Sequence, residues 1–284
     1  DNDTIVVGAP NADGEKIPFE SWSESNQGAV YVFTRSGNTW TEVSKLVASD
    51  RQPDKRLGYS VAIEDTTILV GAPGDNEGAY SSGAAYLFEL VDNNWNEVQK
   101  LKASSIQTNA EFGYSVALDG DNLIIGAYKH PFINLTDGDL DPAGAAFVFT
   151  RENNIWQEEQ MLALSQTILN SYFGRTVDIQ GDQILVGSIH QRVYPGSNNN
   201  GPVYLFRKIN STWVLNDTLI DNDLEDYSFF AETIALAGDH ILIGAYEDSE
   251  LADGAGSVYV YHQTDRPLLT VENVTVSEGD HGSK

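Results

Sequence analysis

The chain has 284 residues, enough for one large β domain or two smaller domains, and 41% of them are hydrophobic. Its 42 acidic and 16 basic residues give a formal net charge of −26, which repels nucleic acid and anionic membranes. The absence of cysteine excludes disulfides and thiolate metal ligands, and no apolar run approaches the roughly 18 residues of a membrane helix. The charge suits a secreted protein, a salty medium or a binder of divalent cations, although solubility alone also explains it.

The first predicted element is a continuously apolar strand over residues 4–9 (TIVVGA), which we name strand B of the first repeat. An aromatic and β-branched strand C follows from residue 29 (AVYVF), and a strand D begins near Trp40. After a polar loop, residues 59–63 (YSVAI) alternate as a half-buried strand A, which leads into the next strand B at TILVGAP (67–73). The same order then repeats to the end of the chain.

Fixed offsets define these repeats, and an internal repeat is the strongest guide to a fold. The glycine of the "VGA" motif recurs five times, and a second glycine opens each strand C, at Gly28, Gly83, Gly144, Gly201 and Gly256. At one constant offset from that second glycine stands Trp40, Trp95, Trp156, Trp213 or, in the fifth copy, Leu268. The glycine of "LG" or "FG" follows the tryptophan at a second constant offset in three copies, at Gly58, Gly113 and Gly174. The fourth copy reads "FF" (Phe229, Phe230) and is interpreted as shifted by one position.

Four antiparallel strands per unit, repeated five times, predict an all-β fold, a β-propeller of four-stranded blades. A β-sandwich gives no reason for such constant offsets. The "VGA" glycines fit places where blades converge and backbones approach closely, and the recurrent tryptophans are expected to pack between adjacent blades. Only the connection from strand B to strand C varies in length, which places the insertions on one face.

The pairing of "FG" (112–113 and 173–174) with "GAP" (8–10 and 71–73) resembles the FG-GAP repeat of the integrin α-subunit propeller. The bacterial-type variant, with a tryptophan in each repeat, is more similar still. The resemblance implies that the B–C and D–A loops share a ligand-binding face and that members are mostly extracellular adhesion or surface modules. The family's DxDxDG calcium loop between strands A and B is not matched here, so its calcium binding is not carried over.

We expect the propeller repeats to occupy residues 1–265 and a last-blade strand with a closing or linker tail to occupy 266–284. The chain starts at a strand B without its own strand A, so one strand is missing from five whole units. Residues 268–280 are the segment expected to fill that position, with another molecule or an upstream segment as alternatives. The family usually closes at seven blades, so a fragment of a seven-bladed propeller is the alternative to a five-bladed ring.

Aromatic residues in the B–C loops are the predicted binding site: Phe19, Trp22, Tyr80, Phe132 and Tyr194. If these loops share a face, the rings form an aromatic and acidic rim for glycan stacking or protein contact. Trp22 and Phe19 would alternatively fold down to close their own long loop.

Other polar residues are weaker candidates. Asp137, Asp139 and Asp141 alternate in a B–C loop and could hold Ca²⁺, although a solvated acidic turn explains them as well. The histidines are expected to lie in exposed loops, with a metal or acid–base pair of His130 and His190 as the alternative. Five glycosylation sequons lie at Asn2, Asn134, Asn210, Asn216 and Asn273.

No nucleophile elbow, zinc-protease motif or phosphate-cradling loop is present. The sequence therefore favours a non-catalytic, extracellular or cell-surface module that binds a protein or glycan, without nucleic-acid binding or membrane insertion. One alternative is a structural subunit of a surface appendage or filament, self-assembled by strand donation through the incomplete blade. The other is a glycan hydrolase on a propeller scaffold.

Overall fold

The structure is a computed structural model, and it describes residues 3–13, 25–133, 140–164, 171–188, 201–220, 228–248, 255–262 and 270–272. All regular elements within these ranges are β-strands. Among the same residues there is no helix of the length and apolarity needed to cross a membrane.

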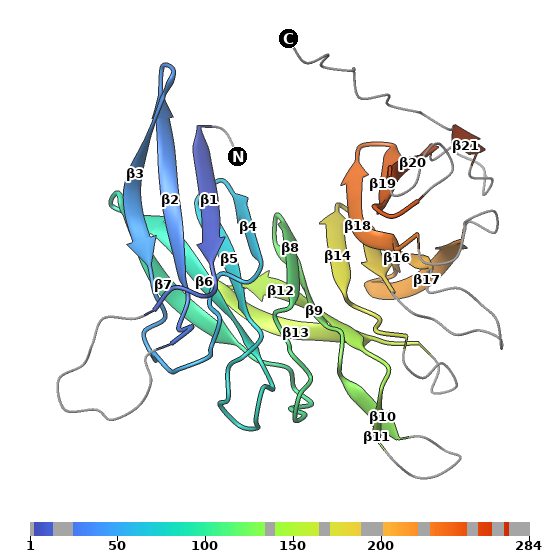
Figure 1. The fold of residues 1–284 in the computed structure, drawn as a ribbon, viewed down its shortest axis with the longest axis horizontal. Coiled ribbons are helices and arrows are strands. Elements are labelled where there is room, and N and C mark those ends of the chain that lie inside the picture. Colours follow the sequence, from blue (N-terminus) through green and yellow to red (C-terminus); the bar gives the residue numbers. More distant parts are fainter. Residues whose placement is uncertain are drawn as a thin grey trace.

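The strands form five antiparallel sheets that follow one another along the chain (Figure 1). The sheets are β1 (Thr4–Ala9), β2 (Ala29–Ser36) and β3 (Thr39–Leu46); β4 (Val61–Glu64), β5 (Thr67–Ala72), β6 (Ala84–Val91) and β7 (Asn94–Leu101); β8 (Ser115–Asp119), β9 (Asn122–Ala127), β12 (Ala145–Glu152) and β13 (Ile155–Leu162); β14 (Thr176–Gln180), β15 (Gln183–Gly187), β16 (Val203–Ile209) and β17 (Thr212–Leu219); and β18 (Phe230–Ala237), β19 (His240–Ala245), β20 (Ser257–His262) and β21 (Thr270–Glu272). A small hairpin, β10 (Pro131–Ile133) with β11 (Leu140–Pro142), extends from the third sheet.

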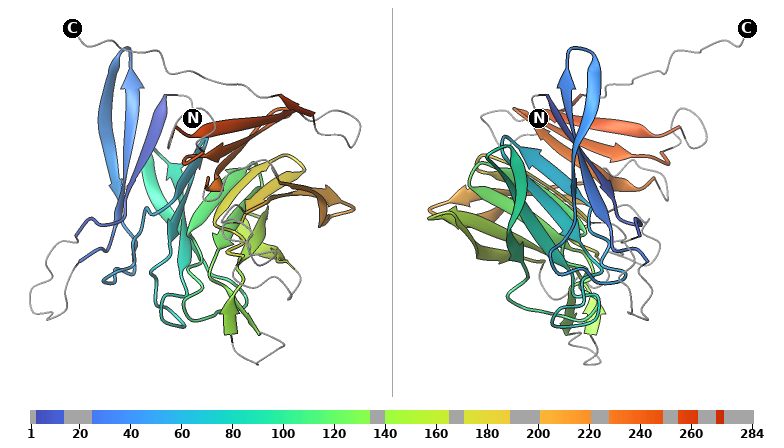
Figure 2. Two further views of the ribbon diagram at one scale, coloured as in Figure 1. Left: turned by 45° about the vertical axis from the view of Figure 1, so that its right-hand side comes forward. Right: turned by 90° about the vertical axis from the view of Figure 1, so that its left-hand side faces the viewer.

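The sheets are arranged as the five blades of a β-propeller, which confirms the predicted fold class (Figures 1 and 2). Strand A is innermost: β4 contacts β8, β8 contacts β14 and β14 contacts β18. Each of the four hydrophobic core clusters lies between two successive sheets. Side chains of a strand B therefore point alternately into two cores, which is why these strands are apolar without interruption.

The recurrent tryptophans pack against the preceding blade, as expected. Trp156 and Trp213 are buried in the clusters that join the second sheet to the third and the third to the fourth. Trp95 packs against the cluster between the first two sheets. Trp40 belongs to the first sheet and is 41% exposed. Burial of this side chain thus depends on a preceding blade.

The constant spacing rests on a close backbone approach between neighbouring sheets. A Cβ atom at Gly71 would overlap the carbonyl oxygen of Gly113, and the pair Gly126 and Gly174 has the same geometry. Gly113 itself has φ = +89°, so it requires glycine for its conformation as well. The motif glycines therefore set the distance between blades, as the sequence predicted.

The fourth copy of the "FG" motif corrects one interpretation of the sequence. Phe230 is 1% exposed and takes the place of the buried motif phenylalanines, while Ala231 takes the place of the glycine with φ = +73°. Thr176 Oγ1 donates to the Ala231 carbonyl over 2.9 Å, as Ser115 Oγ donates to the carbonyl of Gly174. The motif is thus "FA", and the inferred one-position shift is wrong. Ala231 follows Trp213 at the same offset as the motif glycines follow their own tryptophans.

Within the described residues the first sheet has three strands and no strand A, as predicted, so β1 lies at its edge. Ile5 and Val7 on β1 are 42% and 46% exposed, whereas the equivalent strand β5 is buried throughout. At the other end of the chain, β21 pairs with β20 as the fourth strand of the fifth sheet. Within the segment 268–280 that was expected to fill the missing position, residues 270–272 pair with β20 instead, and the other residues lie outside the described ones, so for them the closure stays a prediction.

We expect Gly71→Ala to lower the free energy of unfolding by about 3 kcal/mol, because the neighbouring backbone cannot yield to the added methyl group. Gly120→Ala is the matched control: Gly120 has φ = +58°, but a Cβ there meets no atom within 4 Å. The control should cost only about 1 kcal/mol from its left-handed conformation. Urea denaturation measures both values, and equal losses would contradict the role given to the backbone contact.

Candidate functional site

The B–C and D–A loops lie together on one face of the propeller. Parallel bridges join the ends of the first three B–C loops to the D–A loops that follow them, at Gly28 with Leu57, Gly83 with Phe112 and Gly144 with Phe173. In Figure 1 these connections lie toward the lower edge, where β10 and β11 project. The parts of these loops that the structure describes are therefore held on a rigid scaffold, which is where binding residues usually occur.

Four residues that directly follow the motif glycine or alanine form a continuous row at the start of the innermost strands. This inner row is Tyr59, Tyr114, Arg175 and Glu232. The rings of Tyr59 and Tyr114 have centroids 4.7 Å apart, and the guanidinium of Arg175 lies 5.0 Å from the Tyr114 ring. Arg175 Nη2 then lies 3.0 Å from Glu232 Oε1. The row thus crosses four successive repeats through direct contacts.

Residues of the adjoining loops widen the inner row. The Tyr128 ring lies 4.2 Å from Tyr114 and 5.8 Å from Tyr172, and Arg175 also approaches it, at 5.3 Å. In the fifth repeat, Phe229 and Tyr246 stack with centroids 4.9 Å apart. Rings and a planar cation are therefore gathered around the inner side of the loop face.

Burial and neighbouring charges fix the protonation states in this row. Burial is the main cause that raises the pKa of the Tyr114 phenol, so the ring stays neutral. Burial opposes the charge of Arg175, but the hydrogen bond to Glu232 together with the charge interactions with Glu232 and the neighbouring tyrosines outweighs it, and the pKa is raised. Arg175 therefore presents a permanent positive charge between tyrosine rings.

A buried ion cluster ties the first D–A loop to the second B–C loop. Lys55 is 1% exposed and its Nζ lies 2.6 Å from Asp50 Oδ1 and 3.0 Å from Asp75 Oδ2. Tyr86 OH donates to Asp75 Oδ2 over 2.9 Å, and Lys100 Nζ lies 2.9 Å from the same oxygen. Since Asp75 is fully buried, its charge is balanced by two lysines rather than by water.

The outer part of the cluster continues to solvent. Lys100 Nζ also contacts Asp50 Oδ2 at 2.6 Å and Glu77 Oε2 at 2.7 Å, and Lys102 Nζ lies 2.6 Å from Glu77 Oε1. Burial acts to raise the pKa of Asp50, but hydrogen bonds from Lys100, Lys55 and Tyr86 outweigh it and lower the pKa to about 2. The pKa of Asp75 is lowered by the same balance. These carboxylates stay ionised and hold the loops in place.

The residue type at the position of Asp75 varies between repeats, although its backbone carbonyl keeps the same hydrogen bond. Asp75, His130 and Asp248 each accept a backbone hydrogen bond from the glycine that opens strand C. Asp248 accepts from Tyr259 OH over 2.7 Å, as Asp75 accepts from Tyr86. His130 is 4% exposed, and burial lowers its pKa. The expectation of an exposed loop histidine is therefore wrong for this residue.

The comparisons with known proteins agree with this architecture. The model of the FG-GAP repeat family matches four segments, residues 40–88, 95–149, 156–206 and 213–261, which together cover most of the chain. The chain belongs to the FG-GAP repeat family. A search of curated proteins found no match.

Two of the five predicted binding residues of this FG-GAP propeller, Tyr80 and Phe132, lie among the described residues. Tyr80 is 70% exposed in its B–C loop, and Phe132 lies in β10, where its ring packs 5.2 Å from His130. These two rings make no contact with each other in the described part of the chain. Phe19, Trp22 and Tyr194 lie outside the described residues.

The predicted calcium ligands and glycosylation sites also lie partly among the described residues and partly outside them. Asp141 lies in β11 opposite Phe132, whereas Asp137 and Asp139 lie outside the described residues. Asn210 is exposed in the turn before β17, and Asn216 is exposed on that strand. The sequons at Asn2, Asn134 and Asn273, together with His190, are not among the described residues.

Sequence reasoning missed the inner row and the ion cluster. The available signal for the row was the residue after each motif glycine, which reads Tyr, Tyr and Arg in three copies while the glycine before it stays fixed. For the cluster, the signal was a lysine among acidic residues in "SDRQPDK" (49–55). Within the described residues, one further group has the spacing of metal ligands: Asp239, His240 and His262, at an A–B turn.

We expect Asp75→Asn to lower the free energy of unfolding by about 3 kcal/mol at neutral pH, because Lys55 loses a buried partner. Glu77→Gln is the control within the same cluster; its carboxylate is half exposed, so the loss should stay below about 1 kcal/mol.

The folded-state pKa values of Asp50 and Asp75 are depressed, so the cluster's stabilisation is complete above the unfolded pKa of about 4 and is lost as pH falls toward 2. Denaturation at several pH values measures both effects, and an Asp75→Asn loss that stayed undiminished in acid would refute them.

Proposed function

We propose that this FG-GAP propeller is a non-catalytic, extracellular module that binds a protein or glycan partner through its B–C and D–A loop face. The observation that carries the proposal is the inner row, in which Tyr59, Tyr114 and Arg175 contact one another across three repeats. Tyrosine and arginine are the residue types that dominate binding hot spots, because they combine large contact area with polar ends.

Comparison of the repeats within the chain supports a binding role for this row. The preceding Phe112, Phe173 and Phe230 are all buried, as the packing of the blades requires. The inner-row residue, by contrast, lies two positions after this buried residue and differs between repeats. It is a tyrosine in the first two copies, an arginine in the third and a glutamate in the fourth. Since the same fold accepts all of these, packing does not demand aromatic rings there. A position whose residue type the fold does not dictate is available for recognition.

The row also has the mixed character of a binding surface. Tyr59 is 38% exposed and Tyr246 is 52% exposed, so apolar ring area faces solvent at both ends of the group. Arg175 and Lys129 supply positive charge in a chain of net charge −26, and each is held by a glutamate. Rings flanking a held cation suit an acidic loop of a protein or the face of a sugar ring.

The ion cluster argues against acid catalysis on the same face. A glycoside hydrolase needs one carboxyl group that is protonated near neutral pH and can donate to the leaving group. Hydrogen bonds from lysine instead lower the pKa of Asp50 to about 2, and the pKa of Asp75 is lowered as well. These carboxylates act as structural anions.

Binding assays on defined arrays of extracellular protein domains and of glycans test the proposal. We expect the chain to bind a limited set of these, and Tyr114→Ala and Arg175→Ala to weaken that binding at least about tenfold. Tyr59→Ala should disturb the fold least, since Tyr59 is more exposed than Tyr114. Thermal unfolding should confirm that each variant is folded.

Trp40→Ala is the matched control, because Trp40 is an exposed aromatic residue away from the loop face. It should leave binding unchanged. Binding that survives all three inner-row substitutions would refute the assignment of the face. Release of reducing sugar from the arrayed glycans would refute the non-catalytic role and favour the hydrolase alternative.

The second candidate function is self-assembly by strand donation, and the edge of β1 favours it. In the described part of the chain, β1 pairs with β2 alone, and Ile5 and Val7 expose apolar surface beside the open edge. An open, apolar edge strand can accept a strand from another molecule.

Light scattering on the chain tests this candidate. Strand donation predicts oligomers whose proportion rises with concentration and falls in Val7→Lys, because a charged side chain disfavours pairing at an edge. Val43→Lys on β3 is the control, since Val43 is similarly exposed, and it should leave the oligomers intact. A stable monomer at all concentrations would count against strand donation.

A further inference from the structure

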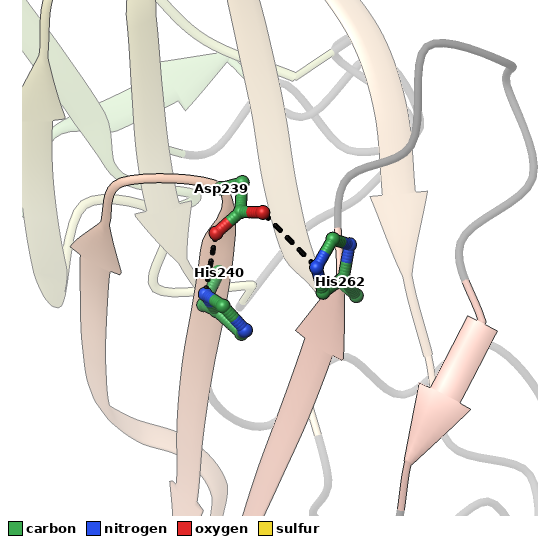
Figure 3. A group of neighbouring side chains, drawn as sticks. All are labelled: Asp239, His240 and His262. Atoms are coloured by element: carbon green, nitrogen blue, oxygen red, sulfur yellow. Dashed lines mark ion pairs between the residues drawn. The ribbon is translucent and has the colours of Figure 1, made fainter.

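Two histidines and an aspartate meet at the end of the fifth sheet that is remote from the loop face. His240 opens β19 and lies directly opposite His262, the last residue of β20. Asp239 precedes His240 in the turn, and Figure 3 shows its carboxylate directed at both imidazoles. Asp239 Oδ1 lies 2.6 Å from His240 Nδ1, and Oδ2 lies 3.0 Å from His262 Nε2.

The other repeats show that the fold does not require this arrangement. The register pairs equivalent to His240 and His262 are Thr4 with Thr34, Thr67 with Glu89, Asn122 with Thr150 and Gln183 with Arg207. The turn aspartate has a structural partner in two repeats, where Asp3 pairs with Arg35 and Asp121 with Arg151. These arginines directly follow Thr34 and Thr150, the residues equivalent to His262, so in the fifth repeat the aspartate contacts imidazoles at the register pair itself instead of an arginine one residue farther on.

The two imidazoles are also on the side of the fifth sheet away from the fourth. Tyr259 and Tyr261 of β20 point into the core shared with the fourth sheet, so the alternating His262 points the other way. The side chains of His240, His262 and Asp239 are 43%, 41% and 58% exposed. A dissolved ion can reach all three, and the side chains have room to adjust.

We propose that Asp239, His240 and His262 form a site for Zn²⁺ or a similar divalent transition-metal ion. Each residue offers one ligand atom, and the three atoms lie within 4.8 Å of one another. Two imidazole nitrogens and one carboxylate oxygen are a ligand set that zinc accepts, with water in the fourth position, whereas calcium and magnesium prefer oxygen ligands alone.

The side chains have to close around the ion. In a tetrahedral zinc site with bonds of about 2.0–2.1 Å, ligand atoms lie about 3.3 Å apart. The distances of 2.6 and 3.0 Å run to different oxygens of Asp239, and the three ligand atoms lie within 4.8 Å of one another, so a movement of up to about 1.5 Å by these partly exposed side chains completes the set. The bound ion would link the A–B turn to the end of strand C, and because it binds the folded chain it would stabilise it.

Calorimetric titration of the untagged, chelator-treated chain with zinc chloride tests the site, with calcium chloride as the comparison. We expect one zinc ion to bind per chain and a rise in melting temperature with zinc. His262→Ala and His240→Ala should each weaken zinc binding at least about tenfold and abolish the rise in melting temperature. Both histidines are partly exposed, so the metal-free variants should melt like the wild type.

Asp121→Asn is the matched control, because Asp121 occupies the same turn position in the third repeat beside Arg151. It should bind zinc as the wild type does. Cobalt substitution adds an independent signature, since a tetrahedral site with nitrogen ligands gives intense visible absorption that His262→Ala should remove. Zinc binding that is absent, or equal in wild type and both histidine variants, would overturn the proposal.

Discussion

The architecture depends on a backbone contact between glycines of neighbouring blades. Gly71 and Gly126 lie so close to the carbonyl groups of Gly113 and Gly174 that no side chain fits between them. The same motif closes each repeat internally, since Gly113 N donates to Gly126 O over 3.0 Å. Removing a side chain on both partners lets the innermost strands converge, while larger residues farther out fill the widening space between the blades. The repeat offsets follow from this single constraint.

That constraint separates the positions used for packing from those of the proposed binding row within each repeat. In the third repeat the phenylalanine before the motif glycine is buried, and the residue after that glycine, Tyr114, directly precedes the innermost strand β8 on the loop face. Packing decides the first of these residues and leaves the second free to vary. Tyr59, Tyr114 and Arg175 are therefore brought into one row by the scaffold, although they come from three different repeats of the sequence. The same separation operates at the opposite end, where the first position of strand B carries His240 in the fifth repeat.

Sequence patterns predicted the strand types well because each type has its own pattern of buried and exposed residues along the strand. Strand B of the second blade is buried on both faces and reads as a continuous apolar run, while strand A of the fourth blade alternates between buried and partly exposed residues. The inner row and the ion cluster escaped prediction because their contacts join residues from different repeats. Lys55 and Tyr86 come from separate blades, and nothing local in either segment indicates that a buried lysine meets a tyrosine hydroxyl at 2.7 Å. The fourth motif was misread because Ala231 adopts a conformation that normally requires glycine.

Amide hydrogen exchange tests the central role of the glycine contacts most directly. The amides of Gly58, Gly113 and Gly174 donate within their own blades to Gly71, Gly126 and Gly187 at 3.0 to 3.1 Å, and the carbonyls of the same three glycines are the groups that meet the preceding blade at Gly8, Gly71 and Gly126. If these contacts hold the propeller together, the three amides should exchange only through global unfolding, as slowly as the slowest amides of the central strands. Fast exchange at these glycines while strands B and C remain protected would show that the blades are held by their side-chain cores alone, and would contradict the account.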